Sequence, residues 1–136
     1  MFKLLIAARD RHKVEQVKQA FDHCDCQVIP APSMSLALFL TQKNLPDLIL
    51  ADTDLTDGDG IKLLQELKSE PELRAIPFIF YVSPSNKVLD EKQALLYGAA
   101  ALLNDAVKDT DLYDFTMPLI QSRVVTKGKR QEETPE

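Results

Sequence analysis

The chain has 136 residues, of which 45% are hydrophobic and 27% charged, and its formal net charge is −5. This size and composition are typical of one globular domain with its own core, and they exclude wholesale disorder. The excess of acidic residues argues against nucleic-acid binding. No apolar run approaches the roughly 20 residues that span a bilayer. We therefore expect a cytoplasmic protein that binds neither nucleic acid nor membrane.

Apolar runs and helical patterns alternate along the first half of the chain. Residues 2–8 are almost continuously apolar, which is typical of a buried parallel strand. A helix over 11–22 follows, then a short strand over 26–29, a helix over 34–44 and a strand over 48–51. The apolar residues that we expect on the inner face of the first helix are Val14, Val17, Ala20 and Phe21.

The second half continues the same alternation. A helix is predicted over 61–69, and the run 78–82 is rich in aromatic and β-branched residues, which favours a strand. A helix over 87–97 ends at a glycine, and a fifth strand is predicted over 99–103. A last helix begins near residue 109.

Five strands that alternate with five helices predict a three-layer α/β fold with a parallel sheet covered on both faces. We expect one domain over 1–125, followed by a polar tail or the start of a linker over 126–136 that is disordered. Pro118 lies inside the last helix, so this helix either kinks near Asp114 or starts late.

The run His23-Cys24-Asp25-Cys26 invites a metal-site interpretation. A tetrahedral site needs four converging ligands, however, and His12 is the only other histidine. The spacing of the two cysteines also disfavours a disulfide. We therefore expect neither a metal nor a disulfide at this run.

Asp52 stands at the end of the third predicted strand, where parallel sheets gather their chemistry. The run 46–60 resembles the phosphoacceptor strand and loop of bacterial response-regulator receiver domains, and 94–99 resembles the approach to their fifth strand. The resemblance covers residues 2–125. It implies a flavodoxin-like, doubly wound (βα)5 fold with strand order 2-1-3-4-5, a role in two-component signal transduction, and Asp52 as the phosphoacceptor position.

The resemblance also implies that the positions around Asp52 have lost their functional residues. Receivers bind Mg²⁺ with an acidic pair after the first strand, where this chain has Ala8 and Arg9. Their Thr or Ser after the fourth strand is replaced by Val82, and their Lys after the fifth strand by Asp105.

These losses predict a degenerate receiver, because phosphoryl transfer to a carboxylate depends on positioning and on neutralisation by metal and cationic side chains. We expect a signalling domain that acts through protein contacts, is not an enzyme and needs no cofactor, with Mg²⁺ only if the pocket proves functional. The alternative is a receiver that is phosphorylated on Asp52 through an unusual pocket.

Two questions about charged residues near Asp52 stay open. The Arg9 guanidinium either reaches Asp52 or Asp105, in place of a metal cation, or points to solvent. Asp10, Asp52 and Asp54 either rebuild a Mg²⁺ site or have local roles, with Asp10 as a helix cap; we favour the local roles.

Asp52 and Asp54 also fit a second family. The run 52–56 is similar to the D-x-D-x-T motif of haloacid-dehalogenase-type phosphatases, in which the first Asp is a nucleophile and the second a general acid. In that family the motif follows the first strand, whereas two strand–helix units precede it here, and no later Asp-Asp pair occurs. This phosphatase is therefore the second alternative.

If the domain is no longer switched by phosphorylation, its function depends on the surfaces that contact other proteins. The resemblance implies contacts through the fourth helix, the fifth strand and the last helix. The expected partners are a sensor kinase or an output domain, which is fused C-terminally or separate, and a homodimer is a further arrangement. The candidate exposed apolar residues there are Leu89, Tyr97, Tyr113 and Phe115, although each alone fits the core or an ordinary scattered surface position better.

Overall fold

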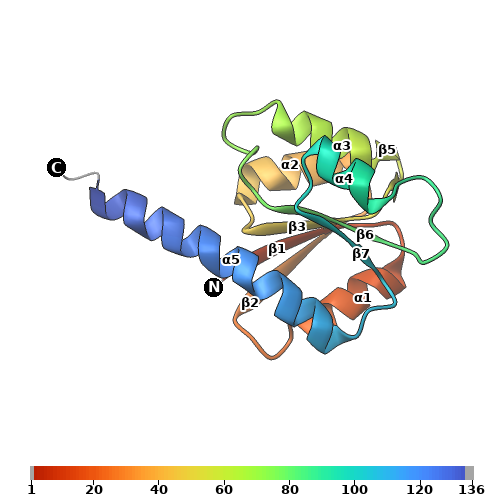
Figure 1. The fold of residues 1–136 in the computed structure, drawn as a ribbon, viewed down its shortest axis with the longest axis horizontal. Coiled ribbons are helices and arrows are strands. Elements are labelled where there is room, and N and C mark those ends of the chain that lie inside the picture. Colours follow the sequence, from red (N-terminus) through yellow and green to blue (C-terminus); the bar gives the residue numbers. More distant parts are fainter. Residues whose placement is uncertain (1, 134–136) are drawn as a thin grey trace.

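The computed structural model describes the backbone of residues 2–133 and the side chains of residues 2–121. Strands and helices alternate along this part of the chain (Figure 1), and each predicted strand and helix has a counterpart. The elements are β1 (Phe2–Ala7), α1 (Arg11–Ala20), β2 (Cys26–Ala31), α2 (Met34–Asn44), β3 (Leu48–Ala51), β4 (Asp54–Leu55), β5 (Gly58–Asp59), α3 (Gly60–Lys68), β6 (Phe78–Val82), α4 (Glu91–Tyr97), β7 (Ala101–Asn104) and α5 (Asp109–Glu133).

The main sheet has the strand order β2-β1-β3-β6-β7, and each neighbouring pair is parallel. β6 and β7 are its fourth and fifth strands, because the short β4 and β5 pair with each other in a separate antiparallel hairpin. The predicted 2-1-3-4-5 order and the flavodoxin-like fold are confirmed. Among the described residues, no helix has both the length and the apolar content to cross a membrane.

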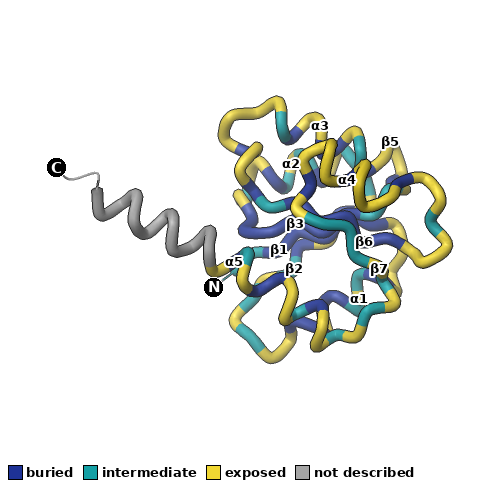
Figure 2. Tube along the Cα trace, viewed as in Figure 1, coloured by how far each residue is buried: buried dark blue, intermediate teal, exposed yellow. Residues whose placement is uncertain are grey.

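Helices cover both faces of the sheet, with α1 and α5 on one face and α2, α3 and α4 on the other (Figure 1). Successive strand residues therefore point into two different cores. In β6, Phe78 and Phe80 pack into the core beneath α2–α4. Ile79 and Tyr81 pack into the core beneath α1 and α5. Figure 2 shows the result, a buried sheet within exposed outer helix faces.

The loop after β3 is held by a contact that the sequence did not predict. The carboxylate of Asp57 accepts hydrogen bonds from the backbone N–H of Met34, at 2.6 Å, and from both the N–H and the hydroxyl of Ser35. The hydroxyl hydrogen bond of Ser35, followed by the backbone donors, lowers the pKa of Asp57. The β4–β5 hairpin is thereby tied to the start of α2.

The fourth helix is shorter than predicted, since α4 begins at Glu91 and not at residue 87. Asp90 caps it: its carboxylate accepts from the Gln93 N–H at 2.8 Å, and the Gln93 side chain accepts from the Asp90 N–H at 3.1 Å. Leu89 precedes the cap and is buried in the core, so of the two alternatives for this residue the core position is the one observed.

The other three residues predicted on this face differ in exposure. Tyr97 and Phe115 are exposed by 41% and 45%. Tyr113 is half-buried, because its ring packs 5.7 Å from that of Phe21 and 4.5 Å from that of His23, measured between centroids. Tyr113 therefore belongs to the core beneath α1 and α5 rather than to the free surface.

The last helix begins at Asp109 and continues through Pro118, so the alternative of a late start is wrong. Its backbone is helical to Glu133, where the sequence predicted a disordered polar tail from residue 126. Lysine, arginine, glutamine and glutamate are good helix formers, so a polar segment can extend a helix that is already formed. Residues 134–136 lie outside the described part of the chain.

Candidate functional site

The carboxyl ends of the parallel strands bring two carboxylates together. Asp52 follows β3, and its backbone N–H donates to the carbonyl of Ala7 at 2.9 Å. Asp105 follows β7, and its backbone N–H donates to the carbonyl of Val82 at 2.7 Å. Two carboxylates held at one edge of a sheet repel each other unless a cation lies between them.

Lys13 of α1 supplies that cation. Its Nζ lies 2.7 Å from Oδ2 of Asp52 and 3.2 Å from Oδ2 of Asp105, and it donates to the carbonyl of Tyr81 at 2.9 Å. An ammonium group has three N–H donors, so these three oxygens match its full capacity. The Lys13 side chain is 2% exposed, against 21% and 22% for the two carboxylates, so its charge depends on these partners.

The start of α1 directs Lys13 toward the sheet. Asp10 is the N-cap, and its Oδ1 accepts from the N–H of His12 at 2.9 Å, which confirms the predicted capping role. Lys13 precedes Val17 by four residues and Ala20 by seven, so the three share the buried face of the helix. This spacing was the available signal, but the sequence analysis placed only apolar residues on the inner face and missed Lys13.

Arg9 does not fill the role proposed for it. Its Nη1 lies 3.0 Å from Oδ2 of Asp54, and the two side chains are 55% and 72% exposed. Of the two alternatives for Arg9, the pairing with Asp52 or Asp105 is wrong, because the cation at those carboxylates is Lys13. An ion pair as exposed as Arg9–Asp54 contributes little to stability.

The remaining predicted positions do gather around Asp52. Ala8 directly follows β1 and Val82 ends β6; they are 2% and 3% exposed, and neither side chain carries a hydrogen-bonding group. The Asp105 carboxylate shares the Lys13 ammonium with Asp52. The pocket therefore contains one buried cation, two carboxylates and no hydroxyl at the Val82 position.

The residues present do not fit a Mg²⁺ ion. Magnesium requires six oxygen ligands in a nearly ideal octahedron, and an ammonium group already lies on Asp52. Asp10 caps α1 and Asp54 pairs with Arg9, so the three weak candidate ligands are engaged separately. Within the described residues, no three His, Cys, Asp or Glu side chains are grouped so as to hold a metal.

Cys24 and Cys26 are free thiols. Burial is the main cause that raises the pKa of both, to about 12 for Cys26, so they stay protonated near neutral pH. A protonated thiol is a poor metal ligand. The Sγ of Cys24 donates instead to the carbonyl of Phe21 at 3.2 Å.

Tyr81 presents a buried hydroxyl that has no hydrogen-bond partner among the described residues. Burial, and to a smaller degree the charges of Asp105 and Asp109, raise the pKa of Tyr81, so the hydroxyl stays neutral. An unsatisfied buried hydroxyl costs about 1–3 kcal/mol.

We expect Tyr81→Phe to raise the free energy of unfolding by about 1 kcal/mol in urea denaturation. Tyr97→Phe, at an exposed position, is the control and should change nothing; a loss of stability in Tyr81→Phe would contradict the prediction.

The phosphatase alternative is not supported by the geometry. It requires Asp54 to act as a general acid beside Asp52, but the Asp54 side chain is 72% exposed and lies next to Arg9, with no contact to Asp52 among the described residues. Asp52 itself lies at the third strand of a five-stranded sheet, with two strand–helix units before it.

Comparison with known sequences gives one consistent result. The family model of the response regulator receiver domain matches residues 4–116. The response regulator PleD of Caulobacter vibrioides is 30% identical over 97 residues, which are 71% of this chain and 21% of PleD. The chain thus spans about a fifth of the length of the curated relatives that it matches.

Solved structures share the same fold. A putative response regulator from Chloroflexus aurantiacus J-10-fl matches with a TM-score of 0.80 at 22% identity, over 88% of this chain and 98% of that one. The signal receiver domain of a signal transduction histidine kinase from Syntrophus aciditrophicus matches with a TM-score of 0.78 at 25% identity, over 90% and 92% of the two chains.

Proposed function

The chain belongs to the response regulator receiver domain family of two-component signalling, and on that premise we propose that it is a degenerate receiver whose acceptor site is held by a lysine instead of a metal and a phosphoryl group. The observation that carries this proposal is the buried Lys13 ammonium, which lies 2.7 Å from the Asp52 carboxylate. Lys13 contacts Oδ2 of Asp52 and the Thr53 N–H donates to Oδ1, so both oxygens of the carboxylate are engaged.

The chemistry of phosphoryl transfer supports the proposal. A phosphoryl group approaching Asp52 carries negative charge that metal ions and cationic side chains normally neutralise. Here Asp105 adds a negative charge at the same edge, and Lys13 already serves both carboxylates. Val82 has no hydroxyl to contact the phosphoryl oxygen. These residues thus favour a pocket whose charge stays fixed over one that switches between an unmodified and a phosphorylated Asp52.

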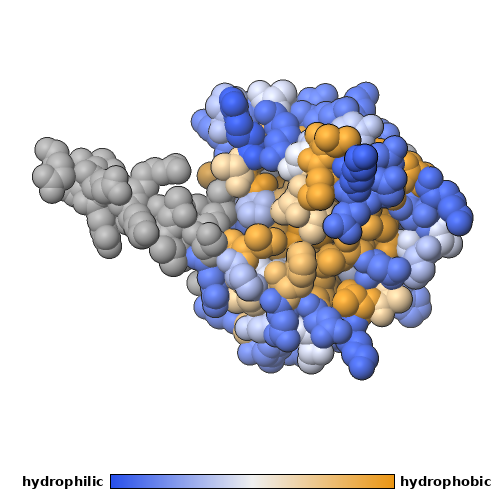
Figure 3. Space-filling view, in the orientation of Figure 1, coloured by the Kyte–Doolittle hydropathy of each residue, from blue (hydrophilic) through white to orange (hydrophobic). Residues whose placement is uncertain are grey.

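A domain without the switch would act through protein contacts. Figure 3 shows apolar side chains gathered over α4, β7 and the beginning of α5. The exposed ones include Leu95, Leu96 and Tyr97 of α4 and Phe115 of α5, with Leu96 at 79%. Apolar surface of this kind favours association with another protein, so we propose a sensor kinase, an output domain or a second copy as partner. The free thiols suit the reducing cytoplasm.

The proposal predicts that the chain gains no phosphoryl group from acetyl phosphate and Mg²⁺. The expected intact mass is unchanged, and beryllofluoride with Mg²⁺ is expected to leave the amide NMR spectrum unchanged, because Lys13 and Asp105 oppose an anion at Asp52. The positive control is a variant with the family's residues restored, Ala8→Asp/Arg9→Asp/Lys13→Met/Val82→Thr/Asp105→Lys, in which we expect an adduct.

A stoichiometric adduct on the unaltered chain that is lost in Asp52→Asn would overturn the proposal and establish the alternative, a receiver phosphorylated through an unusual pocket. Turnover of a generic phosphomonoester that depends on Asp54 would overturn it in favour of a phosphatase. Peptide mapping of any adduct distinguishes Asp52 from the neighbouring carboxylates.

A further inference from the structure

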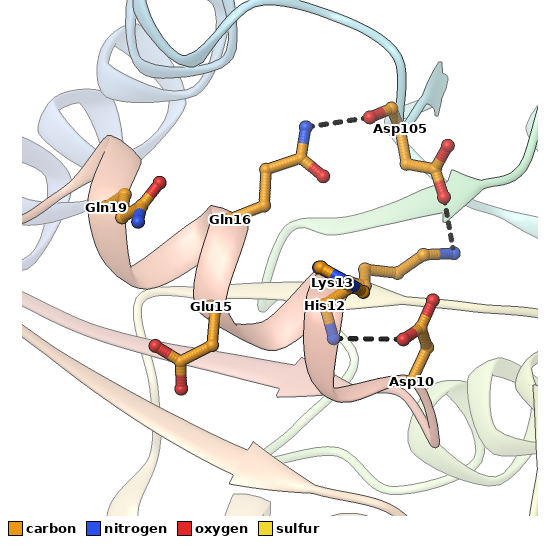
Figure 4. A pocket seen from close by; sticks show the side chains of 7 residues that line it. All are labelled: Asp10, His12, Lys13, Glu15, Gln16, Gln19 and Asp105. Atoms are coloured by element: carbon orange, nitrogen blue, oxygen red, sulfur yellow. Dashed lines mark hydrogen bonds and ion pairs between the residues drawn. The ribbon is translucent and has the colours of Figure 1, made fainter.

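The outward face of α2 carries large apolar side chains, unlike those of α1 and α3. Every exposed residue of α1 and α3 is polar or charged, as Figure 4 shows for His12, Glu15 and Gln19 of α1. On α2, Leu36 and Phe39 are exposed by 38% and 56%, and the helix contains no acidic residue although the chain carries a net charge of −5. The exposed residues of α2 are Ser35, Leu36, Phe39, Gln42 and Lys43. An apolar helix face of this kind is typical of a contact with another protein surface.

The position of α2 in the fold leaves this face open. α2 lies at one end of its helix layer (Figure 1). It packs on β1 and β2 and against α3, which in turn packs against α4. Because β2 is an edge strand of the sheet, no further helix of this layer lies beyond α2 in the described part of the chain. Another molecule can therefore approach the apolar face.

The exposed residues form a stripe that is symmetrical about its middle. Phe39 is the central residue of α2, five positions from either end. Ser35 lies four residues before it and Lys43 four residues after it, so these three share one side of the helix. Leu36 and Gln42 lie three residues before and after Phe39 on the same side. A two-fold axis at Phe39 therefore pairs Leu36 with Gln42, and Ser35 with Lys43, in two antiparallel copies of α2.

The charges at the two ends of the stripe are complementary under that symmetry. The exposed Asp57 carboxylate lies on the start of α2, where it accepts from the N–H groups of Met34 and Ser35. The hydrogen bond from the Ser35 hydroxyl is the main cause that lowers the pKa of Asp57, so this end is negative near neutral pH. At the other end, Lys43 is the only charged residue of α2, and its Nζ lies 5.8 Å from the centroid of the Phe39 ring. Antiparallel pairing brings each charge beside its opposite.

We propose that two copies of this chain associate through α2, packed antiparallel about a two-fold axis at Phe39. Phe39 and Leu36 supply the apolar contact, and Lys43 of each copy binds Asp57 of the other. The same patch is used by both copies, so the assembly closes at two. One pair of short helices buries less surface than a stable dimer needs, so we expect a weak dimer. The contact goes beyond the proposed function, because it uses a different surface from that over α4, β7 and α5 and does not depend on the state of Asp52.

The test is sedimentation equilibrium of the full chain at concentrations from about 10 μM to about 1 mM, the range in which a weak dimer forms. We expect a monomer–dimer equilibrium. Phe39→Glu should weaken it at least roughly tenfold, because two carboxylates then meet at the axis. Lys43→Glu should weaken it roughly fivefold, because a like charge then faces Asp57. Both positions are exposed, and the amide NMR spectrum of each variant checks that the fold is kept.

Two variants on α4 are the matched controls. Leu96 is 79% exposed and Lys92 is exposed, and both lie outside α2. Leu96→Glu and Lys92→Glu should therefore dimerise as the unaltered chain does. A chain that stays monomeric at about 1 mM, or that forms species larger than a dimer, would overturn the proposal. A dimer that is weakened by Leu96→Glu and not by Phe39→Glu would place the second copy on α4 and contradict it equally.

A spin label tests the antiparallel arrangement. The label is attached to Gln42→Cys in a chain that also carries Cys24→Ser and Cys26→Ser, and this chain is mixed with the ¹⁵N-labelled unaltered chain. We expect the label to broaden the amide signals of residues 34–37 in the other copy, because the two-fold axis pairs Gln42 with Leu36. Broadening centred on residues 41–43 would indicate parallel helices and reject the proposed geometry.

Discussion

Replacing Lys13 with methionine is expected to lower the free energy of unfolding by about 3 kcal/mol, measured by urea denaturation at neutral pH. Methionine preserves the length and apolar contacts of the side chain but removes the charge. Asp52 and Asp105 then face each other without a cation, and the Tyr81 carbonyl loses its donor. Because both carboxylates are about one-fifth exposed, water compensates them partly, which keeps the effect at the lower end of the range for a broken buried pair.

Two further variants identify the cause of that loss. Lys18→Met removes an exposed lysine from the same helix and should cost less than about 0.5 kcal/mol. Adding Asp52→Asn and Asp105→Asn to Lys13→Met should recover about half of the lost stability, because it removes the repulsion between the carboxylates. If Lys13→Met is no more destabilising than Lys18→Met, the ion network does not stabilise this edge of the sheet.

The order of the elements could be predicted from the sequence because buried parallel strands leave a strong local signal. The runs 48–51 and 78–82 are apolar throughout, and both match β3 and β6 to the residue. Helix boundaries were harder, since α4 begins at Glu91, directly after the capping box formed by Asp90, and not where helical periodicity begins. The β4–β5 hairpin has only two residues in each strand, too few for a period-2 pattern to be recognised.

The candidate site could also be predicted only in part from the sequence. The position of Asp52 followed from the end of an apolar strand and from the resemblance, and both are local patterns. Lys13 could not be paired with Asp52 from local patterns, because the two lie 39 residues apart and meet only when α1 packs on the sheet. Cations are usually assigned to the solvent face of a helix, so a buried lysine between two carboxylates contradicts the rule by which helix faces are predicted.

The second large effect is expected at Gly60, the first residue of α3. A Cβ atom there would lie 2.1 Å from the carbonyl oxygen of Asp52 and 3.3 Å from Cε1 of Phe80. The Gly60 N–H also donates to the Thr53 carbonyl at 3.0 Å, so the helix start is fixed against the chain that leaves β3. No side-chain rotation relieves an overlap with a backbone oxygen, so either α3 moves outward or Asp52 shifts.

We therefore expect Gly60→Ala to lower the free energy of unfolding by about 3 kcal/mol, even though alanine is the better helix former by about 1 kcal/mol. Gly58→Ala is the control: its nearest heavy atom would be Sδ of Met34 at 2.8 Å, in a flexible side chain that can move, so the loss should stay below about 1 kcal/mol. Amide NMR shifts in Gly60→Ala should extend to Asp52 and Lys13, because the carbonyl that must move belongs to the residue that binds the ammonium. Unchanged stability in Gly60→Ala would mean that α3 and the Asp52 backbone are not packed as tightly as the geometry requires.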